Sequence, residues 1–376
     1  MQASLECEAH GTTTKLTCAE CGTPICTRCL VKTDVGLKCA EHAQANVAPA
    51  VSRRVAPLVI SALVLVAMGG VILVAARQMA SDTPPRVVVP GQPVGPAAAI
   101  DTPQVFVMGA DGSQPRTLTN RPGATDAHPA WSPKGDRIAF ESVTGGRRAV
   151  WTMQTDGLLL RRLTDGDGTD GAPAWSPDGS RIAFMSDRDG NFEVYVMAAD
   201  GTDVRRLTSS PSTDGYPAWS PDGTRIAFVS DRPAGAPGGP SATLRLHLMA
   251  PDGSGVTPVT DVQAVPERPA WSPDGARLAF ASDRHGDPEL YLVGVDGSAP
   301  TRLTTDPAAD GEPSWSPDGA RLAFASNRDG NAQVYLVNPD GSGLRRLTTE
   351  PRNYGPAFSP DGARLVYIHE PTPEAD

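Results

Sequence analysis

Residues 173–179 read Pro-Ala-Trp-Ser-Pro-Asp-Gly, and this stretch decides the fold because it recurs along the 376-residue chain. Copies begin at Pro129, Pro173, Pro217, Pro269, Pro313 and Pro356. Their aromatic residues follow one another at intervals of 44, 44, 52, 44 and 43 positions. A period of ~40–45 residues is that of one four-stranded blade of a β-propeller. The sequence therefore predicts an all-β propeller.

Each repeat has the local pattern of short strands joined by tight turns. Ser176, Pro177 and Gly179 occupy the first, second and fourth positions of a type I turn, which predicts a hairpin. Strands are expected over residues 181–185 and 194–197, where apolar residues would face both sides of a sheet. Blades that stack face to face need apolar residues on both sides.

The order of the half-repeats predicts how the ring closes. The second half of the pattern, a Val-Tyr-Val-Met-like strand followed by Asp-Gly and Arg-Leu-Thr, occurs six times. Its first copy, residues 105–119, precedes every Trp motif, and the last Trp-type motif, residues 356–368, has no second half after it. One blade is therefore expected to combine both ends of the array, which gives six blades and no unpaired edge.

These repeats resemble the TolB-type propeller repeat, because residues 173–179 and the Ser-Asp-Arg-Asp-Gly-Asn stretch at 186–191 match its elements closely. The resemblance covers about residues 101–370 and implies a six-bladed propeller. The resemblance is less specific for function than for fold. Members include the envelope protein TolB, which docks a lipoprotein, protease-associated propellers and some sugar-acid lyases.

Composition separates the chain into unlike parts. With 38 glycines and 37 prolines the chain is rich in turn-forming residues, as a protein of many short strands requires. Residues 1–100 contain 8 Lys/Arg and 6 Asp/Glu, whereas residues 101–376 contain 25 and 37. The repeat region is acidic, which argues against a nucleic-acid partner.

Eight potential metal ligands near the N-terminus form four pairs, each with two residues between its members. This spacing lets a tight turn direct two side chains at one ion, and eight ligands make two closed, structural zinc sites. A segment this short has few large apolar side chains, so the two ions would supply most of its folding free energy. The predicted ligands are Cys7, His10, Cys18, Cys21, Cys26, Cys29, Cys39 and His42.

Three disulfide bonds are the alternative for six cysteines, but they leave both histidines unexplained. The order of the four pairs resembles the B-box zinc fingers, and closely the B-box-like domains of some bacterial membrane proteins. Domains of that family bind other proteins. The nine-residue spacer before Cys39 is longer than in many B-boxes. The resemblance implies that one ion is held by Cys7, His10, Cys26 and Cys29, and the other by Cys18, Cys21, Cys39 and His42.

Residues 55–76 form the only long apolar run, 22 residues without a charge. As a helix rising ~1.5 Å per residue the run would be ~33 Å long, which is enough to cross a bilayer. A cleaved signal peptide is the alternative, but its apolar core would be shorter. Residues 77–100 hold five prolines among small residues and are predicted to be an extended linker. The expected domains are a zinc-binding domain over 1–45, a transmembrane helix over 55–76, the linker, and a propeller over 101–370.

The sidedness of the protein follows from redox chemistry. Thiolates that bind zinc are best kept in a reducing cytoplasm, whereas the propeller region has no cysteine. Three basic residues precede the apolar run within about 20 residues and two follow it, which agrees weakly with the same orientation. We expect a single-pass protein of the bacterial cell membrane, with the N-terminus in the cytoplasm and the propeller outside.

One position of the repeat varies, the residue before each proline, and variation on a fixed frame is how binding surfaces are made. The predicted strand order puts the loops into the first strands and the loops after the second strands on one face. His128, Tyr216, Arg268 and Glu312 are predicted to rim the mouth of the central channel on that face as a ligand-binding site. The alternative is that they are exposed loop residues without a ligand.

Two further features of the repeats belong to the same face. An insertion over residues 233–242 lengthens the third repeat, and it would either overhang the face or form a tolerated loop. Asp-Arg or Asn-Arg pairs recur at 187–188, 231–232, 283–284 and 327–328. They predict ion pairs or turn hydrogen bonds that lock adjacent blades.

Signatures of catalysis are scarce, because no Gly-x-Ser-x-Gly elbow occurs and every cysteine is assigned to zinc. Lyases of the resembling family use a metal held by channel histidines, which keeps His128 with His285 as an option. The preferred interpretation is a non-enzymatic adaptor or sensor. Its zinc domain would bind a cytoplasmic protein, and its propeller a protein, lipoprotein or cell-wall ligand. The alternative is a membrane-tethered lyase or hydrolase that acts on envelope glycans or peptides.

Overall fold

The computed structural model describes residues 102–165, 168–232, 243–350 and 352–371, and four short strands nearer the N-terminus. The chain divides into two compact units, residues 1–90 and 91–376.

The first unit contains two antiparallel hairpins in its described part. β1 (Leu5–Glu6) pairs with β2 (Thr13–Thr14), and β3 (Leu30–Thr33) pairs with β4 (Gly36–Cys39). In the second pair of strands Leu30 lies opposite Cys39, so β3 and most of β4 lie in the long spacer before this predicted ligand.

Most of the N-terminal predictions fall outside the described residues. Cys39 is the only one of the eight predicted zinc ligands that lies in a described element, and its side chain is not described. The predicted transmembrane helix over 55–76 and the linker over 77–100 also lie outside. Within the part of the chain that the structure describes, no helix is long and apolar enough to cross a membrane.

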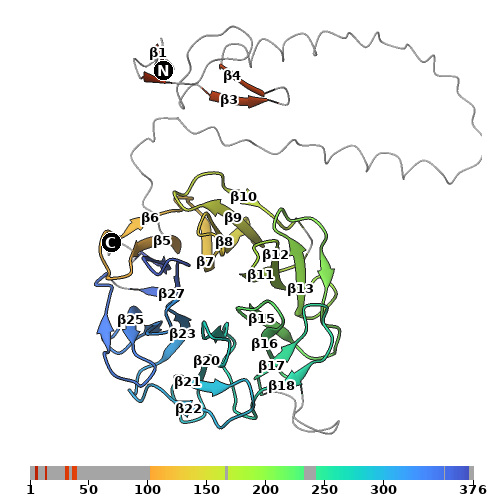
Figure 1. Cartoon of the computed structure of the whole chain (residues 1–376), viewed down its shortest axis with the longest axis vertical. Helices are drawn as coiled ribbons and strands as arrows, with labels where there is room; N and C mark the ends of the chain where they lie inside the picture. Colours follow the sequence, from red (N-terminus) through yellow and green to blue (C-terminus); the bar gives the residue numbers. More distant parts are fainter. Residues whose placement is uncertain are drawn as a thin grey trace, which may run out of the picture. The chain divides into compact units, whose positions relative to one another are not determined.

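The second unit is a β-propeller of six four-stranded antiparallel sheets arranged around a central axis (Figure 1). Blade 1 comprises β7 (Ala124–Trp131), β8 (Arg137–Thr144), β9 (Arg147–Gln154) and β10 (Arg161–Arg162). Blade 2 comprises β11 (Asp170–Trp175), β12 (Arg181–Ser186), β13 (Glu193–Ala198) and β14 (Arg205–Arg206). Blade 3 comprises β15 (Asp214–Trp219), β16 (Ile226–Ser230), β17 (Arg245–Met249) and β18 (Thr257–Pro258). Blades 4 and 5 comprise β19 (Ala270–Trp271), β20 (Arg277–Ser282), β21 (Glu289–Gly294) and β22 (Thr301–Arg302); and β23 (Asp310–Trp315), β24 (Leu322–Ser326), β25 (Gln333–Val337) and β26 (Arg345–Arg346).

Blade 6 joins the two ends of the array, as the half-repeats predict. Its strands are β27 (Asn353–Phe358), β28 (Arg364–His369), β5 (Gln104–Gly109) and β6 (Arg116–Thr117). β28 pairs with β5 from Arg364 opposite Gly109 to His369 opposite Gln104. In Figure 1 the orange β5 and β6 lie beside the blue β27. The prediction of a six-bladed ring closed by sharing one blade is confirmed.

The Ser-Pro-Asp-Gly turn forms as predicted in blade 2. The Gly179 N–H donates to the Ser176 carbonyl over 2.9 Å, and Gly179 has a φ of 71°, which favours glycine. The Ser176 hydroxyl accepts the Arg181 N–H over 3.0 Å and donates to Asp178 over 2.6 Å. The turn and its side-chain bonds therefore fix the register of the first two strands.

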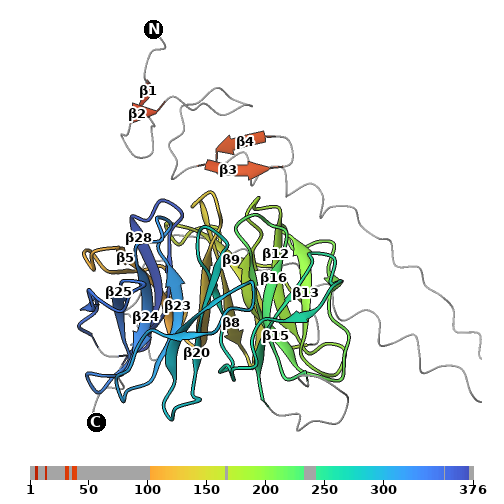
Figure 2. The same ribbon diagram turned by 60° about the horizontal axis from the view of Figure 1, so that its bottom comes forward.

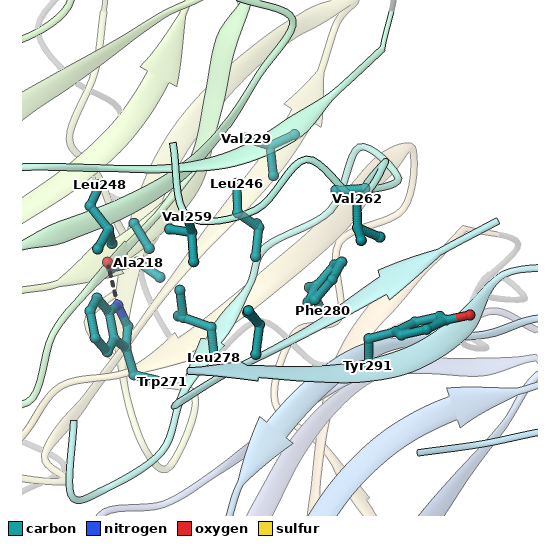
Figure 3. Packing of buried hydrophobic residues seen from close by; sticks show 13 residues of the cluster. Ala218, Val229, Leu246, Leu248, Val259, Val262, Trp271, Leu278, Phe280 and Tyr291 are labelled. Carbon is teal, nitrogen blue, oxygen red and sulfur yellow. Dashed lines mark hydrogen bonds between the residues drawn. The ribbon is translucent and has the colours of Figure 1, made fainter. Parts of the chain in front are cut away.

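Adjacent blades pack through a repeated seam. Figure 3 shows the seam of blades 3 and 4, where the Trp271 indole N–H donates to the Ala218 carbonyl over 3.0 Å. The Arg225 guanidinium of blade 3 lies 5.2 Å from the Trp271 ring, within cation–π range. At the closing seam Arg364 of blade 6 lies 4.7 Å from the Trp131 ring of blade 1. The Arg that follows each turn thus contacts the Trp of the next blade at several seams.

Three of the four recurring pairs place an arginine in an ion pair within its own blade, so the prediction that these pairs lock adjacent blades is wrong. Arg188 pairs with Asp170 over 2.8 Å, and Arg328 pairs with Asp310 over 2.7 Å. The reason is topological, because the loop after the second strand returns beside the start of the first strand of the same sheet. In blade 1, whose hairpin lacks the pair, Arg121 takes this place and binds Asp126 over 2.7 Å.

Two faces of the ring follow from this topology, and the strands of each sheet run between them (Figure 2). The turn face carries the Ser-Pro-x-Gly turns that join first and second strands. The loop face carries the loops that lead into the first strands and the hairpins after the second strands. The predicted insertion, residues 233–242, lies outside the described residues, but β16 and β17 on either side of it meet the loop face.

Candidate functional site

The first strand of each blade lies innermost, and in five blades it contains the variable residue before the proline. In blade 4 this residue, Arg268, lies two positions before β19. His128, Tyr216 and Glu312 have φ values of 49°, 54° and 52°, in the left-handed region that side-chain-bearing residues rarely adopt. Each of these strands shifts register at this point. The shift is a β-bulge, which re-aims a side chain and is common beside functional sites. At the bulge these three residues are therefore not paired with the second strand of their sheet.

A cavity of about 340 Å³ lies in the channel beside these residues. His128, Arg268 and Glu312 line it at one end, and Pro221 and Pro360 of the Ser-Pro-x-Gly turns line it at the other. The cavity therefore extends toward the turn face. The sequence placed the mouth on the loop face. The difference arises because His128 and Glu312 lie within β7 and β23 rather than in the loops before these strands, so the channel continues past them.

Tyr216 is not among the cavity-lining residues, but it belongs to the same cluster. Its ring packs edge-on against His128, with the two ring centroids 5.9 Å apart. The four predicted residues thus come together around one channel, three on the cavity and one behind His128.

A buried carboxylate organises the side of the channel formed by blades 1 and 2. Oε2 of Glu141, in β8, accepts a hydrogen bond from the Ala172 N–H over 3.1 Å and lies 3.1 Å from Nδ1 of His128. Arg148 in β9 pairs with its other oxygen over 3.1 Å. Burial opposes ionisation of Glu141, but His128, Arg148 and the amide outweigh burial and hold its pKa below the usual range. Glu141 is therefore a fixed negative charge that orients His128.

The opposite side of the channel carries two glutamates in a chain of bonds between blades. The carboxyl group of Glu267 accepts the Glu312 N–H over 2.7 Å, and the carboxyl group of Glu312 accepts the Gly355 N–H over 2.7 Å. Burial and the nearby Glu312 raise the pKa of Glu267 to about 8. Glu267 is accordingly uncharged at neutral pH, whereas Glu312 supplies the negative charge.

Arg268 crosses the channel from blade 4 to the far side. It donates over 2.9 Å to the Pro173 carbonyl of blade 2 and over 3.3 Å to the Pro129 carbonyl of blade 1. The sequence suggested that Arg268 lies on the rim of the channel. In the structure its side chain instead spans the floor of the cavity.

Glycines make room for the two carboxylates. A Cβ at Gly171 would lie 2.2 Å from Glu141 Oε2, and a Cβ at Gly311 would lie 2.7 Å from Glu267 Oε2. Both approaches are closer than atoms allow, so Gly171 and Gly311 are needed for the site as well as for the strand.

The family model described as the TolB beta propeller domain matches residues 160–238 and 245–375. The chain belongs to the TolB beta-propeller family. No curated protein matches the sequence.

Several solved structures have a similar fold. The putative TolB from Agrobacterium tumefaciens is 23% identical, with a TM-score of 0.61 over 72% of this chain and 99% of that one. TolB from Acinetobacter baumannii is 22% identical, with a TM-score of 0.57 over 68% of this chain and 66% of that one. Hydrazine synthase from Kuenenia stuttgartiensis is 16% identical, with a TM-score of 0.56 over 73% and 48%. These likenesses show the fold.

Two residues of the site in this TolB-family propeller were missed by the sequence analysis. Glu141 stands where the other blades have Met185, Val229, Ala281, Ala325 or Ile368, and Glu267 stands where three other blades have glycine. A position-by-position comparison of the six repeats would have shown both as charges at apolar or glycine positions.

The structure does not bring His128 and His285 together as metal ligands. His285 Nδ1 lies 2.6 Å from the Tyr291 hydroxyl in the outer part of blade 4, whereas His128 lies on the channel. Among the residues that the structure describes, no group of three or more His, Cys, Asp or Glu side chains is arranged to hold a metal ion.

The raised pKa of Glu267 predicts a pH-dependent stability. Because the pKa rises from 4.5 to about 8 on folding, the folded state holds a proton that the unfolded state releases between these values. The wild-type free energy of unfolding should therefore fall as pH rises from about 5 to about 9, whereas Glu267→Gln should not show this fall. One pKa unit corresponds to about 1.4 kcal/mol, so the difference is on the order of a few kcal/mol.

Denaturant melts of both proteins across this pH range measure the effect. Glu350→Gln is the control, since Glu350 is an exposed glutamate away from the channel. Parallel pH curves for wild type and Glu267→Gln would contradict the assignment of a neutral Glu267.

Proposed function

We propose that this TolB-family protein is a membrane-anchored adaptor or sensor whose propeller binds a segment of a partner protein in the channel cavity. The observation that carries the proposal is the cavity of about 340 Å³ with His128, Arg268 and Glu312 at its floor. Convergent charged groups at the end of a concave site are the mark of a binding pocket. Membership of the TolB beta-propeller family supports a protein partner in general terms.

The finer parts of the proposal rest on the sequence. Residues 1–45 would bind two zinc ions and engage a cytoplasmic protein, and residues 55–76 would anchor the chain as a single-pass protein of the cell membrane. The propeller would then face the bacterial envelope, where its partner is a protein, a lipoprotein or a cell-wall component. The two described hairpins are consistent with a small domain at the N-terminus.

Cross-linking in native membranes tests the proposal. We expect a partner protein to be cross-linked to the wild-type propeller, and we expect the yield of this cross-link to fall about tenfold in His128→Ala. The reason is that truncation of a hot-spot residue costs about 1 kcal/mol or more of binding free energy. His285→Ala is the matched control, since this histidine bonds Tyr291 away from the cavity. Equal cross-linking in all three proteins would rule out the channel as the binding site.

A second candidate function is favoured by the bond between His128 and Glu141. A carboxylate at 3.1 Å from Nδ1 orients the ring and leaves Nε2 for proton transfer, as in general acid–base sites. This arrangement would suit a lyase or hydrolase that acts on envelope glycans or peptides at the cavity. Turnover of such substrates that is lost in His128→Ala, with cross-linked partners unchanged, would favour the enzyme over the adaptor.

A further inference from the structure

Arg268 is a cation in the middle of the propeller without an anion beside it. Its guanidinium donates to two backbone carbonyls, those of Pro173 and Pro129, and among the described residues it takes part in no ion pair. Burial lowers the pKa of Arg268 to about 10, although Glu312 and Glu141 oppose this shift from a greater distance. Charged groups removed from water are normally paired.

The other arginines near the first strands follow that rule. Arg188, Arg328 and Arg148 each pair with a buried carboxylate, those of Asp170, Asp310 and Glu141. Each of these carboxylates is at most 4% exposed in its side chain, and each arginine serves to neutralise it. Arg268 has no such carboxylate to neutralise, so its positive charge has no partner of its own in the described fold.

A purely structural bar across the channel would not need a charge. Two hydrogen bonds to carbonyl oxygens are within the reach of uncharged donors, which would avoid the cost of removing a guanidinium from water. The retained charge is accounted for if an anion completes the site. The cavity beside Arg268 provides the space, since Arg268 is one of its lining residues.

We infer that Arg268 is the receptor for a carboxylate of the bound protein segment, either its C-terminal carboxylate or an Asp or Glu side chain. This inference rests on the proposed function and names the chemistry of the anchoring group. A guanidinium presents its N–H donors in a plane that matches the two oxygens of a carboxylate.

The surroundings favour a single negative charge. His128 lies on the same cavity and can donate a further hydrogen bond, whereas Glu312 would repel a dianion such as phosphate. Indole and proline rings line the rest of the cavity, including Trp175 and Trp271, and they suit an apolar side chain next to the carboxylate. The ligand is thus expected to be an extended peptide end or a peptide with one acidic residue.

Affinity selection on the full-length protein in detergent tests the inference. The probes are three pools of synthetic hexapeptides: one with a free C-terminal carboxylate and no acidic side chain, one amidated without acidic side chains, and one amidated with a single Asp. A uronic-acid trisaccharide is a fourth probe. Retained molecules are measured by mass spectrometry for wild type, Arg268→Gln, Arg268→Lys and the control Arg205→Gln, whose arginine is exposed in β14.

We expect wild type and Arg205→Gln to retain one of the two pools that carry a carboxylate about tenfold better than the amidated pool without acidic side chains. A tenfold difference in affinity corresponds to the free energy of about one charge-assisted hydrogen bond. Arg268→Gln should lose this preference while still melting at or above the wild-type temperature, and Arg268→Lys should keep part of it. Preference for the pool with a free C-terminus would identify a C-terminal carboxylate as the anchoring group, and preference for the pool with a single Asp would identify a side-chain carboxylate.

Other outcomes overturn the inference in distinguishable ways. If peptides are retained equally with and without a carboxylate, the receptor role of Arg268 fails and the proposed function stands. If no peptide pool is retained, or only the trisaccharide is, the proposed protein-binding function fails together with the inference. If Arg268→Gln melts well below wild type and keeps the preference, Arg268 is a structural bar.

Discussion

A chain that starts at residue 120 is expected to lose cooperative unfolding, whereas a chain that starts at residue 101 keeps it. The shorter chain lacks β5 and β6, so β28 becomes an unpaired edge and blade 6 loses Val105, Val107 and Met108, which are at most 3% exposed. Burial of each such side chain stabilises by about 1.5–3 kcal/mol, and a domain is stable by only about 5–15 kcal/mol in all. Calorimetry and circular dichroism of both truncated proteins measure the difference.

Point variants separate loss of the strand from loss of length. Val105→Asp should unfold or strongly destabilise the propeller, because it places an unpaired charge in a fully buried position of the closing blade. Val204→Asp is the control, since Val204 is 40% exposed. A stable protein that starts at residue 120 would show that the ring does not depend on its shared blade.

Removal of metal is expected to unfold the N-terminal domain and leave the propeller intact. The eight predicted ligands would bind two zinc ions per chain, and each structural ion contributes about 10–16 kcal/mol to folding. A chelator should therefore release both ions and abolish the chemical-shift dispersion of residues 1–45. The propeller should keep its melting temperature, because it forms a separate unit.

The same experiment decides between zinc and disulfide bonds. Under the zinc hypothesis a reductant without a chelator leaves the N-terminal domain folded, whereas under the disulfide alternative it unfolds the domain. Cys26→Ser should lower the metal content from two ions to one, with the propeller unchanged. A purified protein that carries no zinc and unfolds with reductant alone would refute the zinc sites.

The fold was readable from the sequence because its information is local and repeated. A turn such as Ser176 to Gly179 is fixed by four residues and by bonds among residues five or fewer apart. Six copies of one short pattern, with a half-repeat at each end, leave a closed ring as the arrangement that pairs every strand.

The binding site was only partly readable, because its contacts cross the ring. The position before each proline was visible as variable, and four of the six residues at this position line the cavity. The partners of these residues were not visible, since Arg268 bonds carbonyls 95 and 139 positions away and Glu267 bonds the next blade. The extension of the cavity toward the turn face was not visible either, because a bulge within a strand leaves little trace in a pattern of apolar residues.

The sequence by itself determined the number of blades, the turns and the shared closing blade, since each depends on neighbours along the chain. It also supplied the zinc-ligand and transmembrane predictions, which stay predictions. The tertiary structure alone decided that Arg268 spans the channel, that Glu141 holds His128 and that the cavity extends toward the turn face. These facts depend on which side chains six separate strands bring to one axis, and no local rule specifies that.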